Sequence, residues 1–244
     1  MNFAGIFMAV TVFFFVSKLM GKSISPYLAQ YGGDYFAFVL IGIALSGFLT
    51  TGLGVFSSSV SSAQSTGTLE AMLVTPTSLP EIVLLSSLYS FIFTALNVLV
   101  YLIFGVAVFG LDLGRANVPA AMLVLLLMVL VFSGLGIIAA SFVMLFKRGD
   151  PVGWIFGSVS SVMGGTFFPV QILPAWLQKL SYLFPVFYGL RAMRLALLKG
   201  VGLAALAPDI AALAAFAALI VPLSLWSFSL AVRRAKIDGS LATY

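Results

Sequence analysis

Six long apolar stretches follow one another along the chain, and no ionisable side chain lies near the middle of any of them. A helix that crosses a bilayer needs about 20 mostly apolar residues to match the hydrocarbon core. Only 8% of the 244 residues are charged and 62% are hydrophobic, so the chain has too few polar side chains to cover a water-soluble domain of this length. The pattern predicts an all-α integral membrane protein.

The predicted architecture has six transmembrane helices in a single domain, residues 1–244. The spans cover residues 3–20, 35–60, 82–109, 118–146, 152–168 and 204–232. With a cytoplasmic N-terminus, five basic residues lie inside and seven outside, against the positive-inside rule. Four of those seven belong to residues 171–200, which look partly embedded, and without them the count is five against three. We therefore expect a multi-pass protein of the plasma membrane (the inner membrane of a Gram-negative cell) with both termini cytoplasmic.

Two residue types are missing from the composition, and their absence excludes several chemistries. Without histidine there is no Ser-His or Cys-His nucleophile pair and no imidazole metal ligand, and without cysteine there is no disulfide or thiolate site. The basic residues are scattered, so membrane lipid suits them better as a partner than nucleic acid. We predict no catalytic residue, no metal site and no cofactor in this chain, which is not expected to be an enzyme by itself.

The loop after the second span holds a short predicted helix, residues 67–74. Its apolar side carries Leu69, Met72 and Leu73, and Glu70 lies on the polar side. Pro76 pushes the residue before it out of helical geometry and so ends the segment. This helix is needed neither for crossing the bilayer nor for turning the chain, and it is suited to contact another protein.

Residues 169–199, before the last span, are apolar but interrupted by Pro169, Pro174 and Pro185. Pieces of about a dozen residues are too short to cross the membrane, so we predict re-entrant or interfacial helices. One predicted helical face carries Leu173, Trp176, Leu177, Leu180 and Phe184. For Arg191 and Arg194, which lie one turn apart, and for Lys199, we favour contact with lipid phosphates over recognition of an anionic substrate headgroup.

Small residues recur at every fourth position in two spans. The runs are Gly42, Ser46, Thr50, Gly54, Ser58 and Ser62, and then Gly149, Gly153, Gly157, Ser161 and Gly165. Such runs let helices approach closely or line a transport path, and the sequence leaves both interpretations open. Gly134-x-Gly136-x-x-Ala139 has the spacing of a dinucleotide-binding motif, but it lies inside a predicted span and is not interpreted as one.

The segment Gly67-Thr68-Leu69-Glu70-Ala71-Met72-Leu73-Val74-Thr75-Pro76-Thr77-Ser78 resembles the cytoplasmic signature of ABC type-2 exporter permeases. The proline series from Pro169 to Pro185, followed by Arg191, is similar to the re-entrant extracellular region of the same family. The resemblance implies ATP-driven export by a homodimer of permeases. Each dimer would be joined to two copies of a cytoplasmic ABC ATPase subunit, which binds the ATP and Mg.

The resemblance also implies roles for particular residues. A coupling helix that docks on the ATPase would use Gly67, Thr68, Leu69, Glu70, Met72, Leu73 and Pro76. An outer gate would be formed by Pro169, Pro174, Trp176, Leu177, Pro185 and Arg191. The second and fifth spans would face the transport path, with Ser46, Thr50, Gly54, Gly153, Gly157 and Ser161 as the candidate pathway or packing face. Family members commonly carry charges before the signature, where this chain has Ser61-Ser62-Ala63-Gln64-Ser65, so a less electrostatic coupling contact is expected.

The lack of charges in the spans favours an apolar or amphiphilic substrate, such as a lipid, a drug or a lipid-linked glycan, over a small ion. Two other function classes stay open, an ATP-independent carrier and a structural or pore-forming membrane protein. A carrier driven by protons or sodium usually needs ionisable or cation-coordinating groups near the middle of the membrane, where this chain offers neutral side chains such as Asn97 and Ser133. A structural or pore-forming protein would leave the helix at 67–74 unexplained.

Overall fold

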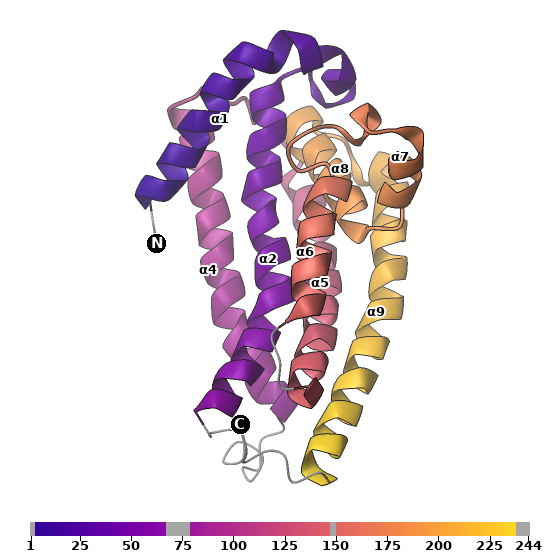
Figure 1. Cartoon of the computed structure of the whole chain (residues 1–244). Coiled ribbons are helices and arrows are strands. Elements are labelled where there is room, and N and C mark those ends of the chain that lie inside the picture. Colours follow the sequence, from indigo (N-terminus) through magenta and orange to yellow (C-terminus); the bar gives the residue numbers. More distant parts are fainter. Residues whose placement is uncertain (1–2, 67–78, 147–149, 238–244) are drawn as a thin grey trace. The chain divides into compact units, whose positions relative to one another are not determined.

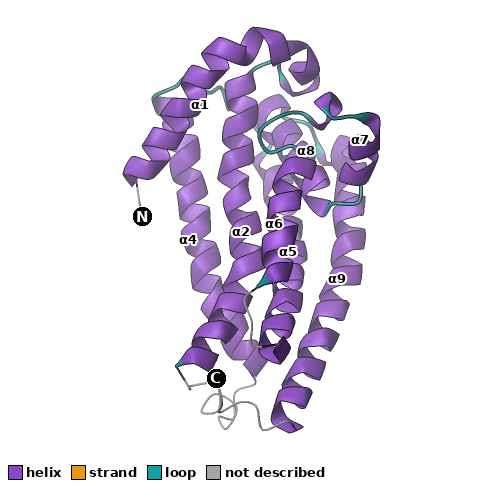
Figure 2. Ribbon diagram, in the orientation of Figure 1, coloured by secondary structure: helices purple, strands orange, loops and turns teal. Residues whose placement is uncertain are grey.

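The structure is a computed structural model that describes residues 3–66, 79–146 and 150–237. Within these residues every regular element is a helix, as the ribbon coloured by secondary structure shows (Figure 2). The elements labelled in Figure 1 begin with α1 (Phe3–Ile24), the 3-10 helix η1 (Ser25–Tyr31), α2 (Tyr35–Ser65), α4 (Leu79–Ala107) and α5 (Val118–Phe146). They continue with α6 (Pro151–Met163), the 3-10 helix η2 (Val170–Ile172), α7 (Ala175–Ser181), α8 (Pro185–Lys199) and α9 (Leu203–Ile237). The all-α prediction is confirmed in this part of the chain.

Four helices are long and apolar enough to cross a membrane. They are α2, residues Ser87–Ala107 of α4, α5, and residues Leu203–Ala235 of α9. Each of them corresponds to a predicted span, and α5 agrees with its prediction at both ends. Most of the apolar stretch of α2 is buried within the chain, whereas only a small share of the apolar stretches of α4 and α9 is buried. The side chains at these exposed surfaces are largely apolar, which is what a lipid solvent requires of a multi-pass membrane protein.

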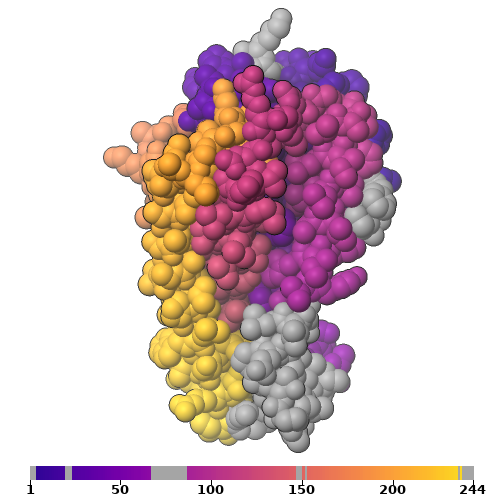
Figure 3. All heavy atoms as spheres, turned by 180° about the vertical axis from the view of Figure 1, so that it is seen from behind, coloured from indigo at the N-terminus to yellow at the C-terminus, as the bar shows by residue number. Residues whose placement is uncertain are grey.

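Figure 3 shows one face of the molecule, on which side chains of α4, α5 and α9 form the surface. The large apolar side chains exposed on α4 and α9 include Leu88, Tyr89, Leu99, Ile103, Leu219 and Trp226. Apolar side chains exposed on helices long enough to cross a membrane are the kind that lipid can cover.

The predicted spans at 3–20 and 152–168 match shorter apolar helices. In α1 the apolar stretch covers Ala4–Leu19, and α6 ends at Met163, five residues before the predicted end at 168. The 13 residues of α6 extend for about 20 Å at about 1.5 Å per residue, less than the roughly 30 Å of a hydrocarbon core. Gly165 follows in a left-handed conformation, φ 70°, which ends the helix. The count of six spans therefore stays a prediction.

Local chemistry sets several other helix ends. Asp34 precedes α2, and its side-chain Oδ1 accepts a hydrogen bond from the Phe36 N–H at 2.9 Å. Pro185 opens the first turn of α8, where a missing N–H does no harm. Gly200 ends the same helix at φ 65°, and a side chain there would overlap the Arg115 carbonyl.

Side chains pack into two compact units, each assembled from three separate segments. Unit 1 contains the residues up to Gly47, Ala95–Met128 and Val159–Ala215, and unit 2 contains Phe48–Thr94, Val129–Ser158 and the residues from Phe216 onward. Because α2, α4, α5, α6 and α9 contribute to both, no single point in the sequence separates the units. Each unit is described below by itself.

Each unit has its own apolar core. In unit 1, one cluster contains Ile6, Val10, Phe36, Ala37, Leu40 and Leu111, and a second contains Leu28, Tyr31, Tyr35, Phe38 and Val39. In unit 2 the core is formed by Phe56, Val60 and Ala63 of α2, Ala140, Val143 and Met144 of α5, and Phe228, Ala231 and Ala235 of α9. The residues of α2 are therefore central to both cores.

Glycines of α5 let helices of unit 2 approach closely. A Cβ atom added to Gly136 would overlap the carbonyl oxygen of Gly52 in α2, and one added to Gly134 would lie 2.7 Å from Cγ2 of Ile220 in α9. These are the glycines with the spacing of a dinucleotide-binding motif, and in the fold they serve helix packing. Their importance follows from the neighbours and not from the motif.

Replacing Gly136 with alanine is expected to destabilise the protein by about 1–3 kcal/mol, because the added methyl group forces α5 away from α2. The measurement is the thermal unfolding midpoint of the purified protein in detergent. Gly54→Ala is the matched control, since a Cβ at position 54 has no atom within 4 Å among the described residues and alanine favours the helix. Equal losses in both variants would contradict the packing role of Gly136.

Candidate functional site

The predicted coupling segment lies outside the described residues. This applies to Gly67, Thr68, Leu69, Glu70, Met72, Leu73 and Pro76. On either side of it, α2 ends at Ser65 and α4 begins at Leu79. The coupling role of these residues stays a prediction from the sequence.

The prolines of the predicted re-entrant region begin successive helical pieces within unit 1. Pro169 precedes η2, Pro174 precedes α7, and Pro185 is the first residue of α8. In Figure 1, α7 and α8 lie close to the first turns of α9. The chain is therefore divided at the positions the prolines predict, although a membrane re-entry of these pieces stays a prediction.

The short helix α7 leaves its apolar side chains uncovered by this chain. Trp176 is 63% exposed and Leu180 is also exposed, while Leu177 is half-buried. The fully buried residue of α7 is Ser181, whose hydroxyl donates to the Leu177 carbonyl at 3.1 Å. The apolar side of α7 is thus available to lipid or to another molecule.

The backbone after α6 is not helical, and side chains from other helices bond its carbonyl groups. The Thr166 carbonyl accepts a hydrogen bond from Nη2 of Arg194 at 3.0 Å, and the Phe167 carbonyl accepts one from the Tyr35 hydroxyl at 3.1 Å. Non-helical backbone at membrane depth is tolerated only where such partners satisfy it. Residues from α8 and α2 therefore supply donors where the predicted fifth span is interrupted.

Arg194 is buried inside unit 1, with 2% of its surface exposed. Its Nε donates to the Phe38 carbonyl at 3.1 Å, and its guanidinium carbon lies 3.4 Å from the centre of the Phe38 ring. Among the described residues, carbonyl oxygens and an aromatic face balance its charge, without a carboxylate. The predicted contact with lipid phosphates is wrong for Arg194, because the side chain points into the protein.

The positive charge of Arg194 also affects the pKa of Tyr31 in η1. Burial raises the pKa of the Tyr31 hydroxyl, and the positive charge of Arg194 partly opposes this rise. The Tyr31 ring centre lies 6.0 Å from the guanidinium carbon. Arg194 thus joins η1, α2 and the segment after α6 from its place on α8.

Position 42 of α2 has room only for glycine, because Thr166 and Arg194 occupy the space beside it. A Cβ atom at position 42 would overlap the Thr166 carbonyl oxygen and lie 2.6 Å from Nη2 of Arg194. The sequence left open whether the small residues of α2 serve helix packing or line a transport path. Gly42, the first residue of the run, serves packing.

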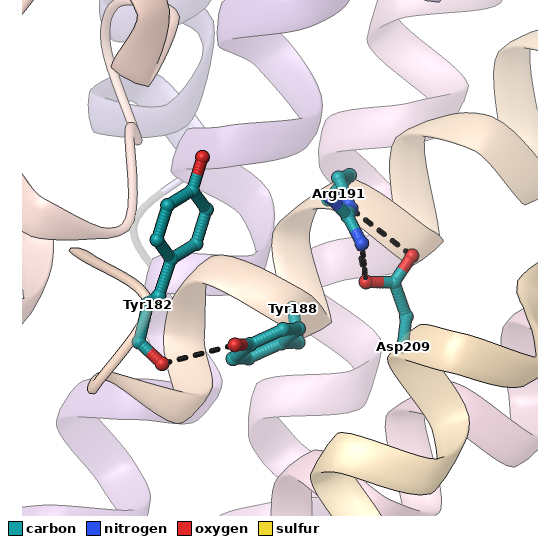
Figure 4. Close-up of polar contacts among 4 residues, drawn as sticks. All are labelled: Tyr182, Tyr188, Arg191 and Asp209. Carbon is teal, nitrogen blue, oxygen red and sulfur yellow. Dashed lines mark hydrogen bonds and ion pairs between the residues drawn. The ribbon is translucent and has the colours of Figure 1, made fainter. Parts of the chain in front are cut away.

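Arg191 forms an ion pair with Asp209 of α9 (Figure 4). Its Nε lies 2.9 Å from Oδ1 and 3.1 Å from Oδ2, and Nη2 lies 2.5 Å from Oδ1. Asp209 is buried, whereas the Arg191 side chain is 31% exposed and lies over the rings of Phe187 and Tyr188. Figure 4 also shows the Tyr188 hydroxyl donating to the Tyr182 carbonyl at 3.0 Å. Asp209 binds the Arg191 guanidinium, and the exposed part of this side chain leaves its predicted contact with lipid phosphates a prediction.

The remaining small residues divide between the units. Ser46 and Ser161 belong to unit 1, and Thr50, Gly54, Gly153 and Gly157 belong to unit 2. In unit 2, Thr50 is exposed and Gly54 has open space at its Cβ position, whereas a Cβ atom added to Gly157 of α6 would lie 3.7 Å from Cδ1 of Leu53, an ordinary van der Waals contact. The α2 run thus changes from a packed to an open face along its length.

A polar contact joins α2 to the start of α6 within unit 2. The buried Ser57 hydroxyl donates to Oδ2 of Asp150 at 2.6 Å, and Oδ1 of the same carboxylate accepts the Gly153 N–H at 2.7 Å. Asp150 thus caps α6 and holds it to α2. A Cβ atom at Gly153 would overlap this carboxylate, so this glycine serves the cap.

The sequence prediction missed Asp209, Tyr35 and the Ser57–Asp150 pair. An acidic residue in the second turn of an apolar span signals a need for a partner. That signal indicates that Asp209 pairs with a cation but does not choose among Arg191, Arg194 and Lys199. The choice depends on how α8 is rotated against α9.

Arg191→Met is expected to destabilise the protein by about 3 kcal/mol, because it leaves the Asp209 carboxylate buried without its partner. The double variant Arg191→Met/Asp209→Leu should regain most of that loss, since it removes both charges. Denaturant unfolding in detergent measures both, with Arg115→Met as a control at an exposed arginine of the same unit. A double variant as unstable as the sum of the two single variants would contradict a direct pair.

The family model for the ABC-2 type transporter matches residues 1–198 of the chain. A comparison of the chain with curated proteins found no match. The match covers most of the chain and includes the α2-to-α8 region described above. The chain therefore belongs to the ABC-2 type transporter family, the membrane permeases that work with an ABC ATPase subunit.

Proposed function

We propose that this chain is the transmembrane permease subunit of an ABC exporter, which moves a hydrophobic or amphiphilic substrate out of the cytoplasm. ATP hydrolysis in a separate ATPase subunit drives the movement. The observation that carries the proposal is that the family match extends through residues 67–78, the segment that resembles the coupling signature. Neither a nucleotide site nor a catalytic residue is assigned to the chain itself.

The assembly that fits this function is a homodimer of the permease with two ATPase subunits, which hold the ATP and Mg. Both termini and the segment 67–74 lie in the cytoplasm of a cell whose plasma membrane contains the complex. The region from Pro169 to Arg191 then lies on the outer side and serves as the gate. The exposed apolar side chains of α7 at Trp176 and Leu180 support its contact with lipid or a second permease.

Contacts within unit 2 support a route for force from the coupling segment. Eight residues before α2 ends at Ser65, Ser57 bonds Asp150 at the start of α6. Nearer the same end, the Gln64 amide donates to the Met144 carbonyl of α5 at 3.4 Å. A push on the end of α2 is therefore passed to α5 and α6 through polar contacts, and rigid helices carry it further.

The open face of α2 supports the choice of substrate class. Thr50 is exposed, and Gly54 leaves open space beside the helix. This face is small and weakly polar, and it carries no ionisable side chain, so it suits an amphiphile better than an ion. We assign Thr50 and Gly54 to the transport path and Gly42 to packing.

Glu70→Ala or Leu69→Asp is expected to weaken association with the ATPase about tenfold, because each alters one side of the docking helix, while insertion into the membrane is unchanged. The measurement is co-purification of the ATPase with the tagged permease, together with the ATP hydrolysis of the complex. Asp112→Ala is the matched control, since it removes an exposed carboxylate from the loop between α4 and α5.

Full ATPase binding and full transport by both variants would contradict the assignment of residues 67–74 as the coupling helix. Transport at the normal rate without any ATPase would show instead that the chain is an ATP-independent carrier. Labelling of position 69 from outside intact cells would reverse the proposed topology.

Gly54→Leu is expected to lower transport several-fold without loss of assembly, because the added side chain enters open space on the path face. Gly42→Leu should instead prevent stable folding, since the same side chain meets the Thr166 carbonyl and Arg194. Transport assays in proteoliposomes and size-exclusion profiles separate the two effects. Normal transport by Gly54→Leu would remove this residue from the path.

A further inference from the structure

The contacts of Arg194 form a small cluster that we call the outer clasp, defined as Phe38, Thr166 and Arg194. Its three members come from α2, from the segment after α6 and from α8, and all lie in unit 1. Arg194 donates from Nε to the Phe38 carbonyl and from Nη2 to the Thr166 carbonyl. One guanidinium therefore connects three segments that are distant in the sequence.

Separating Arg194 from the carbonyl groups of Phe38 and Thr166 costs free energy for each of the polar groups involved. The two carbonyl groups lose their donor in a region where water is scarce, and the guanidinium, which has no carboxylate partner in the described residues, loses its acceptors and its aromatic face. The planar fork of arginine makes the two contacts together, which the single ammonium of lysine cannot reproduce. A motion that keeps the clasp closed is cheaper than one that separates α8 from α2.

We propose that Arg194 is a positioning residue that holds α8, α2 and the segment after α6 together as one body throughout the transport cycle. The outer side then opens by displacement of this body, and α8 does not swing away from α2 by itself. This rests on the proposed function for the cycle, whereas the holding role of Arg194 is a property of the chain alone.

The chain suits a test by cysteine labelling because it contains no cysteine. Thr166 is 1% exposed, and its hydroxyl has no hydrogen-bond partner among the described residues, so Thr166→Cys loses no bond and keeps the carbonyl that Arg194 binds. Phe167, the next residue, is 40% exposed, and Phe167→Cys is the accessible control. The probe is a small charged methanethiosulfonate reagent applied to permeabilised membranes.

Arg194→Gln in the Thr166→Cys background is expected to raise the labelling rate about tenfold, because the segment after α6 opens locally once its donor is lost. Arg194→Lys should give a smaller rise, and Lys199→Gln, which removes an exposed cation from the same helix, should give none. Gly42→Ala offers a second route that keeps the arginine in the chain, since the added methyl group overlaps both the Thr166 carbonyl oxygen and Nη2 of Arg194 and so separates them. An unchanged rate at the exposed Phe167→Cys in each background shows that the reagent reaches this segment equally well, and an unchanged size-exclusion profile shows that the fold is intact.

The one-body motion is tested in the complex with the ATPase during ATP turnover. Labelling at Thr166→Cys should stay low with Arg194 in place, and a rise during turnover would overturn the proposal. An unchanged rate in both Arg194→Gln and Gly42→Ala would overturn the holding role. These variant comparisons need no nucleotide, so they judge Arg194 even if the chain proves not to bind an ATPase.

Discussion

The constraint on which this structure depends is that lipid offers no hydrogen bonds to a backbone. Helices α2, α4, α5 and α9 satisfy this constraint by themselves, since each is long enough to cross an apolar layer with its backbone hydrogen bonds made within the helix. The helix α6 does not, because it ends after 13 residues. Arg194 and Tyr35 supply the donors for the carbonyls that follow, so the side chains of two other helices complete what α6 leaves open.

The same constraint explains where the ionisable groups lie. In the described residues Asp209 is buried against Arg191, Arg194 is buried against carbonyls, and Asp150 accepts bonds from Ser57 and a backbone N–H. Each charge or dipole is satisfied within one compact unit, so each unit gains polar contacts that resist separation of its segments. In a transporter, segments that are joined by such contacts are expected to move together. Relative movement is expected between segments that such contacts do not join.

Glycine illustrates how one residue type serves different purposes within the same helix. Gly42 and Gly52 of α2 have neighbours that a methyl group would strike, whereas Gly54 borders open space. All three look alike as small residues in an apolar span. Only the neighbouring atoms separate close packing from an open face, and mutations at these positions therefore have opposite expected effects.

The sequence by itself determined the all-helical class, the membrane solvent, the bounds of α5 and the places where prolines begin η2, α7 and α8, because these follow from composition, run length and backbone geometry near a single residue. The resemblance at residues 67–78 determined the family, which the match to residues 1–198 agrees with. Only the tertiary structure decided that Arg191 pairs with Asp209, that Arg194 points inward and that α6 stops at Met163. The contacts of the two arginines depend on the rotation of one helix against another, which a linear pattern of apolar and polar residues does not record. The end of α6 depends on the left-handed backbone at Gly165, which the apolar run through this region does not indicate.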